Sequence, residues 1–363
     1  MSVDVEVVVV GGGAMGAATA WQLAARGVSV HVVEQFAPGH TRGASHGASR
    51  NFNVGYEHPR PLAWLREAVP LWRRLEDESG ESLLEITGIV NHGPGRDLAT
   101  AAQAVRAGGF DAELVDPRAA RHRWPQFRFD GPVLHTPDAG RLHADKAVRA
   151  LHAGARRDGA AVLWETKVLS FEPDEKRVRV TVLDEDGRRA ITASRVVVTA
   201  GAWTASLVGG RVPLPSLRVT QEQPAHFAAR EAGEGWPGFN HSPSSDDPAT
   251  SWFPASVYGM HTPGAGVKAG WHAAGPVVDP DTRSFQPDPA LTAQLRRYAR
   301  EWLPGADPDR FSEVTCTYTS TPDAQFVLER CGRIVVGAGF SGHGFKFTPV
   351  IGRILADLAT APE

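Results

Sequence analysis

The chain has 363 residues, a formal net charge of −3 and a pI near 6.5. This charge balance gives no reason to expect a nucleic acid or an anionic membrane surface as a partner, and no stretch approaches the ~18 apolar residues of a transmembrane helix. Single hydrophobic cores stop growing at about 250–300 residues, so the length predicts two domains. Two cysteines, Cys316 and Cys331, cannot form a disulfide framework. We expect a soluble, cytoplasmic protein without a signal peptide, because the first predicted strand begins at once.

The N-terminal region has the order strand, glycine-rich turn, helix, strand. An apolar strand over 5–10 runs into the turn 11–16, and an alanine-rich helix over 14–26 follows. Gly27 stands where helices commonly end, and a second strand covers 28–33. This order predicts the first βαβ unit of a nucleotide-binding sheet.

Each glycine of the turn has a physical role in holding a dinucleotide. Gly11 permits the tight turn, Gly13 lets a pyrophosphate approach the backbone, and Gly16 allows the helix to pack closely on the strand. The helix N-terminus then offers N–H groups to the phosphates. Glu34, at the end of the second strand, can accept hydrogen bonds from ribose hydroxyls. The alternative is an ordinary glycine turn in another α/β protein, and the complete strand–helix–strand context argues against it.

The remaining elements alternate between βαβ and antiparallel stretches, which predicts an α/β (α+β) fold of two interleaved domains. A buried strand over 195–203 ends in small residues, as is typical where a backbone passes close to a nucleotide. Short extended runs over 223–275 predict an antiparallel sheet in a separate lobe. The other predicted helices cover 61–76 (kinked at Pro70), 98–107, 145–158, 290–302 and 348–359, and the other predicted strands cover 88–91, 162–164, 168–171, 177–183, 190–193 and 333–337.

Lysine is rare in this chain and two lysines stand in unusual surroundings. Only five of the 38 basic residues are lysine. Lys268 and Lys346 both lie in glycine-rich segments, 264–270 and 342–346, that do not resemble solvated helix faces. An ammonium with a shiftable pKa is not interchangeable with a guanidinium, so both lysines are candidates for chemistry. The alternative is that both are surface lysines in turns.

Near the C-terminus a cysteine motif precedes a second glycine-rich turn. Cys316 opens the segment 316–323 (CTYTSTPD), and the turn 337–346 (GAGFSGHGFK) follows it. Glycine-rich turns at both ends of the chain predict a cofactor held from two sides, and the cysteine before the second turn suggests a covalent tether. A thiolate nucleophile would need electropositive neighbours. The alternative is a buried, inert thiol, which is the interpretation we give to Cys331.

The glycine fingerprint, the segment 43–50 (GASHGASR), Gly-Val-Lys268, Cys316-x-Tyr-Thr-x-Thr-Pro-Asp323 and the segment 339–346 occur in this order along almost the whole chain. In this pattern the sequence resembles the monomeric sarcosine oxidase family, which includes N-methyltryptophan oxidase and pipecolate oxidase, within the D-amino-acid-oxidase group of flavoproteins. The resemblance implies a monomer with a Rossmann-type FAD-binding domain and a substrate domain built on a large antiparallel sheet. We assign residues 1–85, 143–222 and 311–363 to the first domain, and 86–142 and 223–310 to the second.

The resemblance also implies an activity. FAD held by a thioether from Cys316 would take a hydride equivalent at N5 from the α-carbon of a neutral amine next to a carboxylate. The products would be an imine and, after reoxidation by O2, hydrogen peroxide. No general base is required, and no metal is expected because the histidines lack paired ligand spacing. Three alternatives stay open: a dehydrogenase with another electron acceptor, a non-catalytic flavin-binding protein, and an NAD-dependent enzyme.

Residue roles follow from the same resemblance. Lys268 matches a lysine over the flavin that assists oxygen reduction, where a fixed cation would stabilise developing superoxide, and Lys346 matches a lysine that binds the substrate carboxylate. Arg50 and His46 match residues near the flavin ring, while Tyr258 and His272 match pocket residues that could equally be structural. The predicted cofactor-binding set comprises Gly11, Gly13, Ala14, Met15, Gly16, Glu34, Gln35, Ser45, His46, Ser49, Arg50, Val168, Ala200, Gly201, Trp203, Cys316, Gly339, Gly342, His343, Gly344 and Lys346.

One position departs from the family pattern. Relatives carry a second arginine three residues after Arg50, which binds the substrate carboxylate together with the lysine, and this chain has Asn53 there. A neutral amide cannot replace a charge-assisted bidentate contact, so binding of a minimal substrate such as sarcosine should weaken. Another arginine could substitute, with Arg218 as a candidate. Otherwise the substrate is larger, or its carboxylate is modified or absent.

Overall fold

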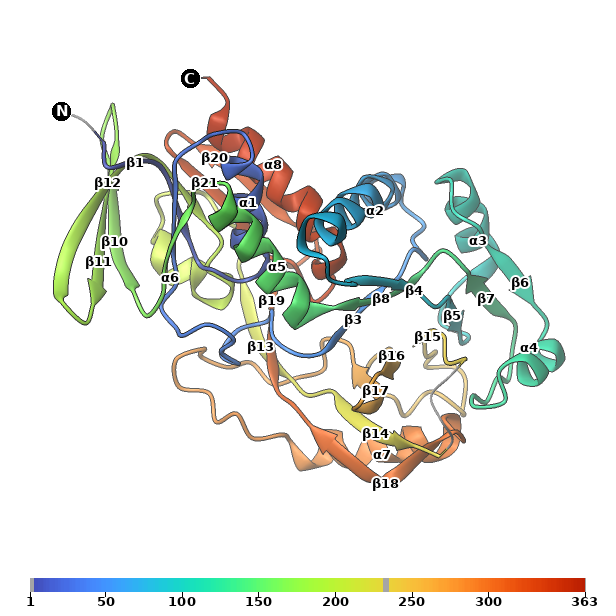
Figure 1. Ribbon diagram of the computed structural model, residues 1–363. Coiled ribbons are helices and arrows are strands. Elements are labelled where there is room, and N and C mark those ends of the chain that lie inside the picture. The colour runs from blue at the N-terminus through green and yellow to red at the C-terminus, as the bar shows by residue number, and fades with distance from the viewer. Residues whose placement is uncertain (1–2, 231–234, 363) are drawn as a thin grey trace.

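The computed structural model describes residues 3–230 and 235–362 (Figure 1), so positions 1–2, 231–234 and 363 of the predicted domains lie outside the described residues. The described chain forms four sheets flanked by helices, an α/β architecture in agreement with the predicted fold class. None of the helices in these ranges combines the length and apolar composition needed to cross a bilayer.

The first sheet is the predicted nucleotide-binding sheet. Strand β1 pairs in parallel with β2 and β12, β2 with β9, and β12 with β21. The valines of β1 are buried, as is typical of parallel strands covered on both faces of the sheet. Its eight strands are β1 (Val5–Val10), β2 (Val30–Val33), β9 (Ala161–Leu163), β10 (Lys167–Pro173), β11 (Val178–Asp184), β12 (Gly187–Val198), β20 (Val327–Cys331) and β21 (Ile334–Ala338).

The prediction of two separate strands over 190–193 and 195–203 is wrong. β12 is continuous because its first half pairs with β11 and its second half with β1, so the ladder is never interrupted. It ends at Val198, and the small residues beyond it form the short 3-10 helix η1 (Gly201–Trp203), followed by α6 (Thr204–Val208).

Helices cover this sheet and position the glycine turn. α1 (Ala14–Ala24) is buried along almost its whole length, and α5 (Ala144–Arg157) and α8 (Thr348–Thr360) pack against it. A Cβ added at Gly352 would lie 2.6 Å from the Ala18 backbone, so the backbones of α8 and α1 are in close contact at this glycine. α2 (Pro59–Ser79), which contains Pro70, packs on α5 and α8.

The second large sheet forms the lobe predicted from residues 223–275. Its pairings are antiparallel except for β5 with β15, and the order is β18-β14-β17-β16-β15-β5-β7-β6. One face packs on an aromatic core that includes Phe239, Trp271 and Tyr298. The elements of this lobe are β5 (Ile89–His92), α3 (Leu98–Ala107), β6 (Glu113–Val115), α4 (Pro117–Arg123), β7 (Val133–Thr136), β14 (Ala225–Ala229), β15 (Gly238–His241), β16 (Val257–Thr262), β17 (Gly266–Trp271), α7 (Pro289–Trp302) and β18 (Ala306–Glu313).

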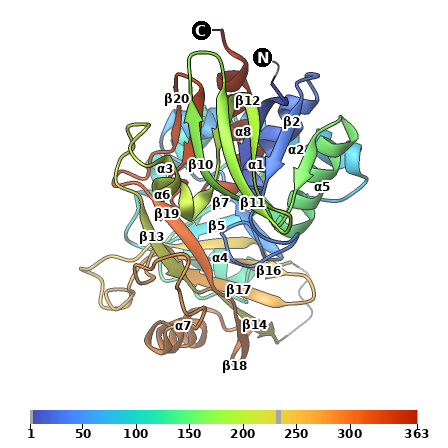
Figure 2. The ribbon, with the colours of Figure 1, turned by 90° about the vertical axis from the view of Figure 1, so that its left-hand side faces the viewer.

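Two small sheets join the large ones. One contains β3 (Ser49–Phe52), β8 (Gly140–His143) and β4 (Leu84–Ile86), and the other pairs β13 (Arg218–Glu222) with β19 (Cys316–Ser320). Figures 1 and 2 show β13 and β19 running between the nucleotide-binding sheet and the lobe. The short helix η2 (Phe345–Phe347) lies beside β3 and leads into α8. Most of the predicted site residues therefore lie at the junction of the sheets.

Candidate functional site

The N-terminal glycine turn has no room for side chains. A Cβ at Gly16 would lie 1.8 Å from the carbonyl oxygen of Gly11, and one at Gly11, whose φ is +98°, would lie 2.6 Å from that of Thr199. Gly13 caps α1 without a side chain, and a Cβ there would meet Ser45 Oγ at 2.9 Å. The backbone N–H groups of the turn are therefore not covered by side chains of the turn itself, at the N-terminus of a buried helix. Binding of a pyrophosphate requires this.

Glu34 is buried and tied to this turn. Its carboxylate accepts hydrogen bonds from the backbone N–H groups of Gly12 at 2.7 Å and Phe36 at 3.0 Å. The following residue, Gln35, begins the loop that leads away from β2. Contact of Glu34 with a ribose stays a prediction, and the observed bonds fix the carboxylate beside the glycine turn.

The loop before β3 is folded by Arg50. Its guanidinium donates to the carbonyl oxygens of Ser49, Ala44 and His46 at 2.8, 2.9 and 2.6 Å. Burial and the Arg50 charge lower the pKa of His46 to about 4, and His46 Nε2 is buried without a hydrogen-bond partner. Ala14 N–H donates to Ser45 Oγ at 2.9 Å, which joins this loop to the glycine turn.

Cys316 lies buried on β19, opposite Glu222 of β13. Burial raises the pKa of the Cys316 thiol, whereas the positive charges of Arg50, Lys268 and Arg283 act to lower it. Three cations therefore favour the thiolate, while burial and the charge of Glu222 oppose it. Cys331 is exposed on β20, which contradicts its interpretation as a buried thiol, because it is the last residue of an edge strand.

The two singled-out lysines are both buried. Lys268 is 4% exposed and donates to the Ser49 carbonyl oxygen at 3.0 Å, and Lys346 is 6% exposed and donates to Tyr56 Oη at 3.0 Å and the His343 carbonyl oxygen at 2.8 Å. Burial lowers the pKa of each ammonium to about 7, helped at Lys268 by Arg50. Within the described ranges neither has a carboxylate at ion-pair distance. The alternative of two surface lysines is wrong.

An aromatic cluster forms around His272, which lies within reach of the Lys346 charge. The rings of His272 and Tyr318 lie 5.5 Å apart, and those of His272 and Tyr258 lie 6.5 Å apart. Burial and the Lys346 charge lower the pKa of His272, and burial raises the pKa of Tyr258. Tyr258 faces Gly270 across the β16–β17 pair, and a Cβ at Gly270 would lie 2.9 Å from its ring. The predicted pocket residues thus form one cluster with Tyr318.

The C-terminal glycine turn packs against the Tyr318 ring of this cluster. Gly339 and Gly342 have φ values of +67° and +74°, and a Cβ at Gly342 would lie 2.0 Å from the Tyr318 ring. His343 and Gly344 follow directly and lead into η2, which carries Lys346. Because position 342 is a glycine, the backbone of the turn can lie directly against the Tyr318 ring, and no other residue would fit there.

Among the other predicted cofactor residues, three follow the C-terminal end of β12 and one lies on β10. Ala200 and Gly201 follow β12, and Trp203 donates from Nε1 to Asp281 at 2.7 Å while its ring lies 5.4 Å from that of Phe36. Val168 is buried on β10 opposite Val182.

Several site residues escaped the sequence prediction. Arg283 is 6% exposed, stacks over Phe285 at 3.9 Å and donates to Gln221 Oε1 at 3.1 Å. Nothing in the sequence distinguishes it among so many arginines. Tyr56 and Tyr318 could have been found, because the chain has only four tyrosines and three of them lie at this site.

Asn53 lies just after β3, and its Oδ1 accepts a hydrogen bond from Gly55 N–H at 3.0 Å. Arg218, the candidate substitute for the missing arginine, is exposed at the start of β13. The explanation that Arg218 replaces the missing charge is therefore not supported.

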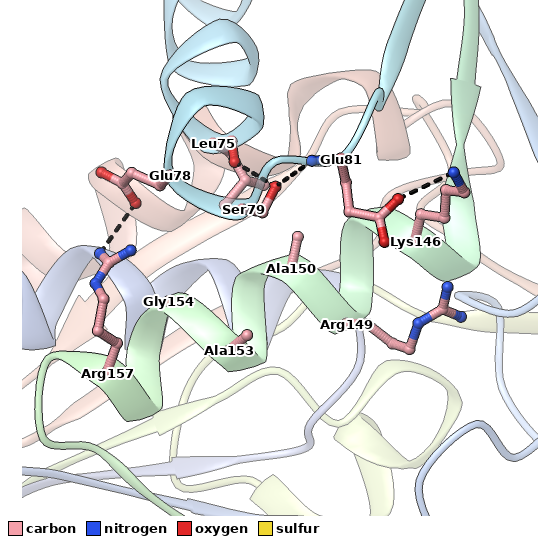
Figure 3. Close-up of a pocket in the computed structure, with 10 residues that line it drawn as sticks. All are labelled: Leu75, Glu78, Ser79, Glu81, Lys146, Arg149, Ala150, Ala153, Gly154 and Arg157. Carbon is pink, nitrogen blue, oxygen red and sulfur yellow. Dashed lines mark hydrogen bonds and ion pairs between the residues drawn. The ribbon is translucent and has the colours of Figure 1, made fainter.

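A separate cavity of about 380 Å³ lies between α2 and α5 (Figure 3). Four of its five charged groups pair with one another: Glu78 with Arg157 at 3.1 Å and Glu81 with Lys146 at 3.0 Å. It contains none of the predicted site residues.

Comparison with known proteins agrees with this geometry. Residues 6–358 match the DAO family of FAD dependent oxidoreductases. The chain is 32% identical to monomeric sarcosine oxidase of Bacillus sp. (strain NS-129), over 99% of this chain and 94% of that protein. It is 28% identical to N-methyl-L-tryptophan oxidase of Yersinia pestis (strain Pestoides F), over 97% and 94%. The structure of NikD, an unusual amino acid oxidase essential for nikkomycin biosynthesis, superposes with a TM-score of 0.85 at 28% identity, over 98% and 94% of the two chains.

The chain therefore belongs to the DAO family of FAD-dependent oxidoreductases. Three predictions are therefore confirmed: the family resemblance, the fold class, and the assignment as a flavin-dependent oxidase of the amine and amino-acid class. The residues also fit the cofactor. The bare glycine turn suits its pyrophosphate, and Arg50, Lys268 and Arg283, which form no ion pair within the described residues, suit a ring that becomes more negative on reduction. Among the described residues no group of three or more histidine, cysteine or acidic side chains is arranged to hold a metal ion.

Proposed function

We propose that the chain oxidises a secondary amino acid (N-methyl or cyclic) or a primary one to an imine, with O2 as the electron acceptor and hydrogen peroxide as the second product. The observation that carries this proposal is the pair of buried lysines, Lys268 and Lys346, with no carboxylate partner in the described chain. A buried ammonium without a counter-charge is costly, so each site fits an anion that is not part of the protein. Bound FAD would supply the hydride acceptor and its reaction with oxygen.

Each residue of the candidate site would have its own role in the reaction. Lys346, held by Tyr56, would bind a substrate carboxylate, and an anion there would keep the ammonium protonated. Tyr258, Tyr318 and His272 would orient the amine and exclude water. Lys268, anchored on Ser49, would stabilise negative charge on oxygen as it is reduced. The flavin would be linked to Cys316, with Arg50 and Arg283 favouring its thiolate.

Cys316→Ala is expected to release all of the flavin on acid precipitation, whereas wild-type protein keeps its colour in the pellet. Cys331→Ala is the matched control, because this thiol is exposed on a different strand and should leave the link intact. Absorbance of supernatant and pellet measures the result. Wild-type flavin in the supernatant would contradict the covalent link.

We also propose that the substrate is bulkier than sarcosine. A hydrogen bond to a charged group contributes about 1.5–3 kcal/mol, so Asn53 weakens binding of a small carboxylate substrate by roughly ten- to a hundredfold. A larger amine can offset that loss by burying apolar area, at about 25 cal/mol per Å².

Asn53→Arg is therefore expected to improve sarcosine oxidation, by about tenfold or more in kcat/KM, because it restores the charge-assisted contact. Oxygen uptake with sarcosine and with a cyclic or aromatic N-methyl amino acid measures the change. If sarcosine is already the best substrate of the wild-type protein, the inference from Asn53 fails.

A second candidate is a tailoring oxidase or dehydrogenase that acts on an amine without a free carboxylate, which the neutral Asn53 favours. An anaerobic flavin-bleaching screen across primary, N-methyl and cyclic amines, followed by admission of oxygen, separates the candidates. Bleaching without reoxidation by oxygen indicates a dehydrogenase. No bleaching by any amine indicates a non-catalytic flavin-binding protein. We further propose a cytoplasmic monomer with the domain division given above.

A further inference from the structure

The chain uses asparagine only four times in 363 residues, at Asn51, Asn53, Asn91 and Asn240. All four lie in one patch, which we call the amide row. It brings together β3, β5 and β15, from segments up to 189 residues apart. A chain that avoids a residue type elsewhere and collects it at one place has a local use for that side chain.

Hydrogen bonds join three of the four amides, and the fourth, Asn53, lies beside them at Gly55. Asn51 Nδ2 donates to Asn240 Oδ1 at 3.5 Å, and Asn240 Nδ2 donates to Asn91 Oδ1 at 3.0 Å. Asn53 and Asn91 meet at Gly55, where an added Cβ would lie 3.1 Å from Asn53 Oδ1 and 3.2 Å from Asn91 Nδ2. The glycine leaves the space that the row needs.

The amide row adjoins the aromatic cluster of the candidate site. Asn240 pairs with Asn91 on one side and with Tyr258 on the other, so the three side chains share one face of the sheet. Asn53 is three residues before Tyr56, which holds Lys346. Figure 1 shows β3 close to β16, and Ser49 Oγ and Thr262 Oγ1 join these strands at 2.6 Å. A substrate against Tyr258 would therefore have the row as its neighbour.

The row has unsatisfied hydrogen-bonding groups of both kinds. Asn51 Oδ1 is a buried acceptor without a donor, and Arg141 Nε is a buried donor without an acceptor. The two residues are directly opposed in the β3–β8 pair. Asn51, Asn53 and Asn240 keep accessible surface, whereas Asn91 is 2% exposed and lies behind them. Leaving buried polar atoms unpaired is costly, so the site suits a ligand that donates and accepts together.

The charges beside the row are already paired. Arg141 forms an ion pair with Glu85 and donates to the His261 carbonyl oxygen at 2.9 Å. Arg96 pairs with Glu57 at 2.9 Å and donates to the Gly55 carbonyl oxygen at 2.7 Å. A carboxylate would place a negative oxygen against Asn51 Oδ1, which is itself an acceptor, and the paired charges beside the row would not compensate for this repulsion. A neutral carboxamide instead offers an N–H donor to that acceptor.

We propose that the amide row is a specificity-determining subsite for a carboxamide group on the amine substrate. The inference rests on the proposed function. A carboxamide carries two donors and an acceptor, the complement of the Asn51 acceptor and the Arg141 donor. Asn53 and Asn240 line the subsite, and Asn91 positions Asn240.

Two matched pairs of compounds test this on the holoenzyme: L-pipecolamide against L-pipecolate, and N-methyl-L-asparagine against N-methyl-L-aspartate. The first pair places the carboxamide on the α-carbon, and the second places it on the side chain and keeps the carboxylate for Lys346. Anaerobic rapid mixing gives dissociation constants, and the rise in Tm gives binding independently of oxidation. In at least one pair the carboxamide is expected to bind about tenfold more tightly.

Asn240→Leu removes the row's central amide and is expected to abolish most of that preference. Asn51→Leu is the second variant, should the first fail to fold. Leu134→Met, a volume-conserving change opposite Asn91, is the control that should keep the preference. Equal or tighter binding of the carboxylate in both pairs overturns the subsite, as does a preference that survives both asparagine variants, or no Tm shift from any of the four compounds. A Tm shift from the carboxamide with no oxygen uptake from any amine refutes the proposed function and leaves the subsite supported.

Discussion

Lys268→Met is expected to slow the reaction of the reduced enzyme with oxygen by about a hundredfold or more, while reduction by substrate changes little. The ammonium is buried, donates a hydrogen bond to the Ser49 carbonyl oxygen, and lies close to the charge of Arg50. Such a fixed cation in a dry site stabilises developing negative charge far more than it would in water, and loss of one preorganised group typically costs 10²–10³ in rate, about 3–4 kcal/mol. Stopped-flow absorbance at the flavin bands separates the two half-reactions.

Lys146→Met is the matched control, because Lys146 pairs with Glu81 on the surface of α5, beside the separate cavity between α2 and α5. It should leave both half-reactions unchanged. Equal slowing of reduction and reoxidation in Lys268→Met would mean that this lysine supports the architecture of the site rather than the oxygen reaction.

Lys346→Met is expected to have the opposite profile, with weaker binding of carboxylate substrates by roughly ten- to a hundredfold and little change in the oxygen reaction. A hydrogen bond to a charged group contributes about 1.5–3 kcal/mol, which sets this range. The concentration dependence of the reductive phase gives the dissociation constant. An unchanged constant would place the substrate carboxylate elsewhere.

The pH dependence of binding gives a second test of Lys346. Burial lowers the pKa of this lysine to about 7, so the free enzyme holds it as a cation below that pH and increasingly as a neutral amine above it. Affinity for a carboxylate ligand that carries no amine, such as cyclohexanecarboxylate, should be highest below pH 7 and fall by about tenfold for each pH unit above it. The dependence should disappear in Lys346→Met. The nearby His272 does not produce the same trend, because its pKa is lowered from 6.5 and it is neutral across this range.

The parts of the site that depend on local sequence could be predicted from it. The glycine turn, the helix after it and Glu34 lie within thirty residues, and each has a steric reason that the sequence displays. The rarity of lysine was sufficient to single out Lys268 and Lys346, because a residue used seldom is used where its chemistry is needed.

Other parts required the fold. Arg283 lies near Cys316 only because β13 and β19 pair, and the amide row forms only because β3, β5 and β15 converge. Long-range pairings of this kind leave no trace in the periodicity of either segment. Counting asparagines would have drawn attention to the row, but not to the contacts within it. The continuity of β12 was missed for the same reason, since two different partner strands support its halves.

The close contact of α1 with α8 has a consequence for how the protein is made. β1 and the glycine turn leave the ribosome long before β21 and α8, which complete the sheet and cover α1. The nascent chain must therefore hold α1, with Trp21 and its apolar neighbours, without the cover of α8 until that C-terminal helix has been made. A chain cut before Thr348 would lack α8 and would leave the face of α1 that α8 covers exposed to water.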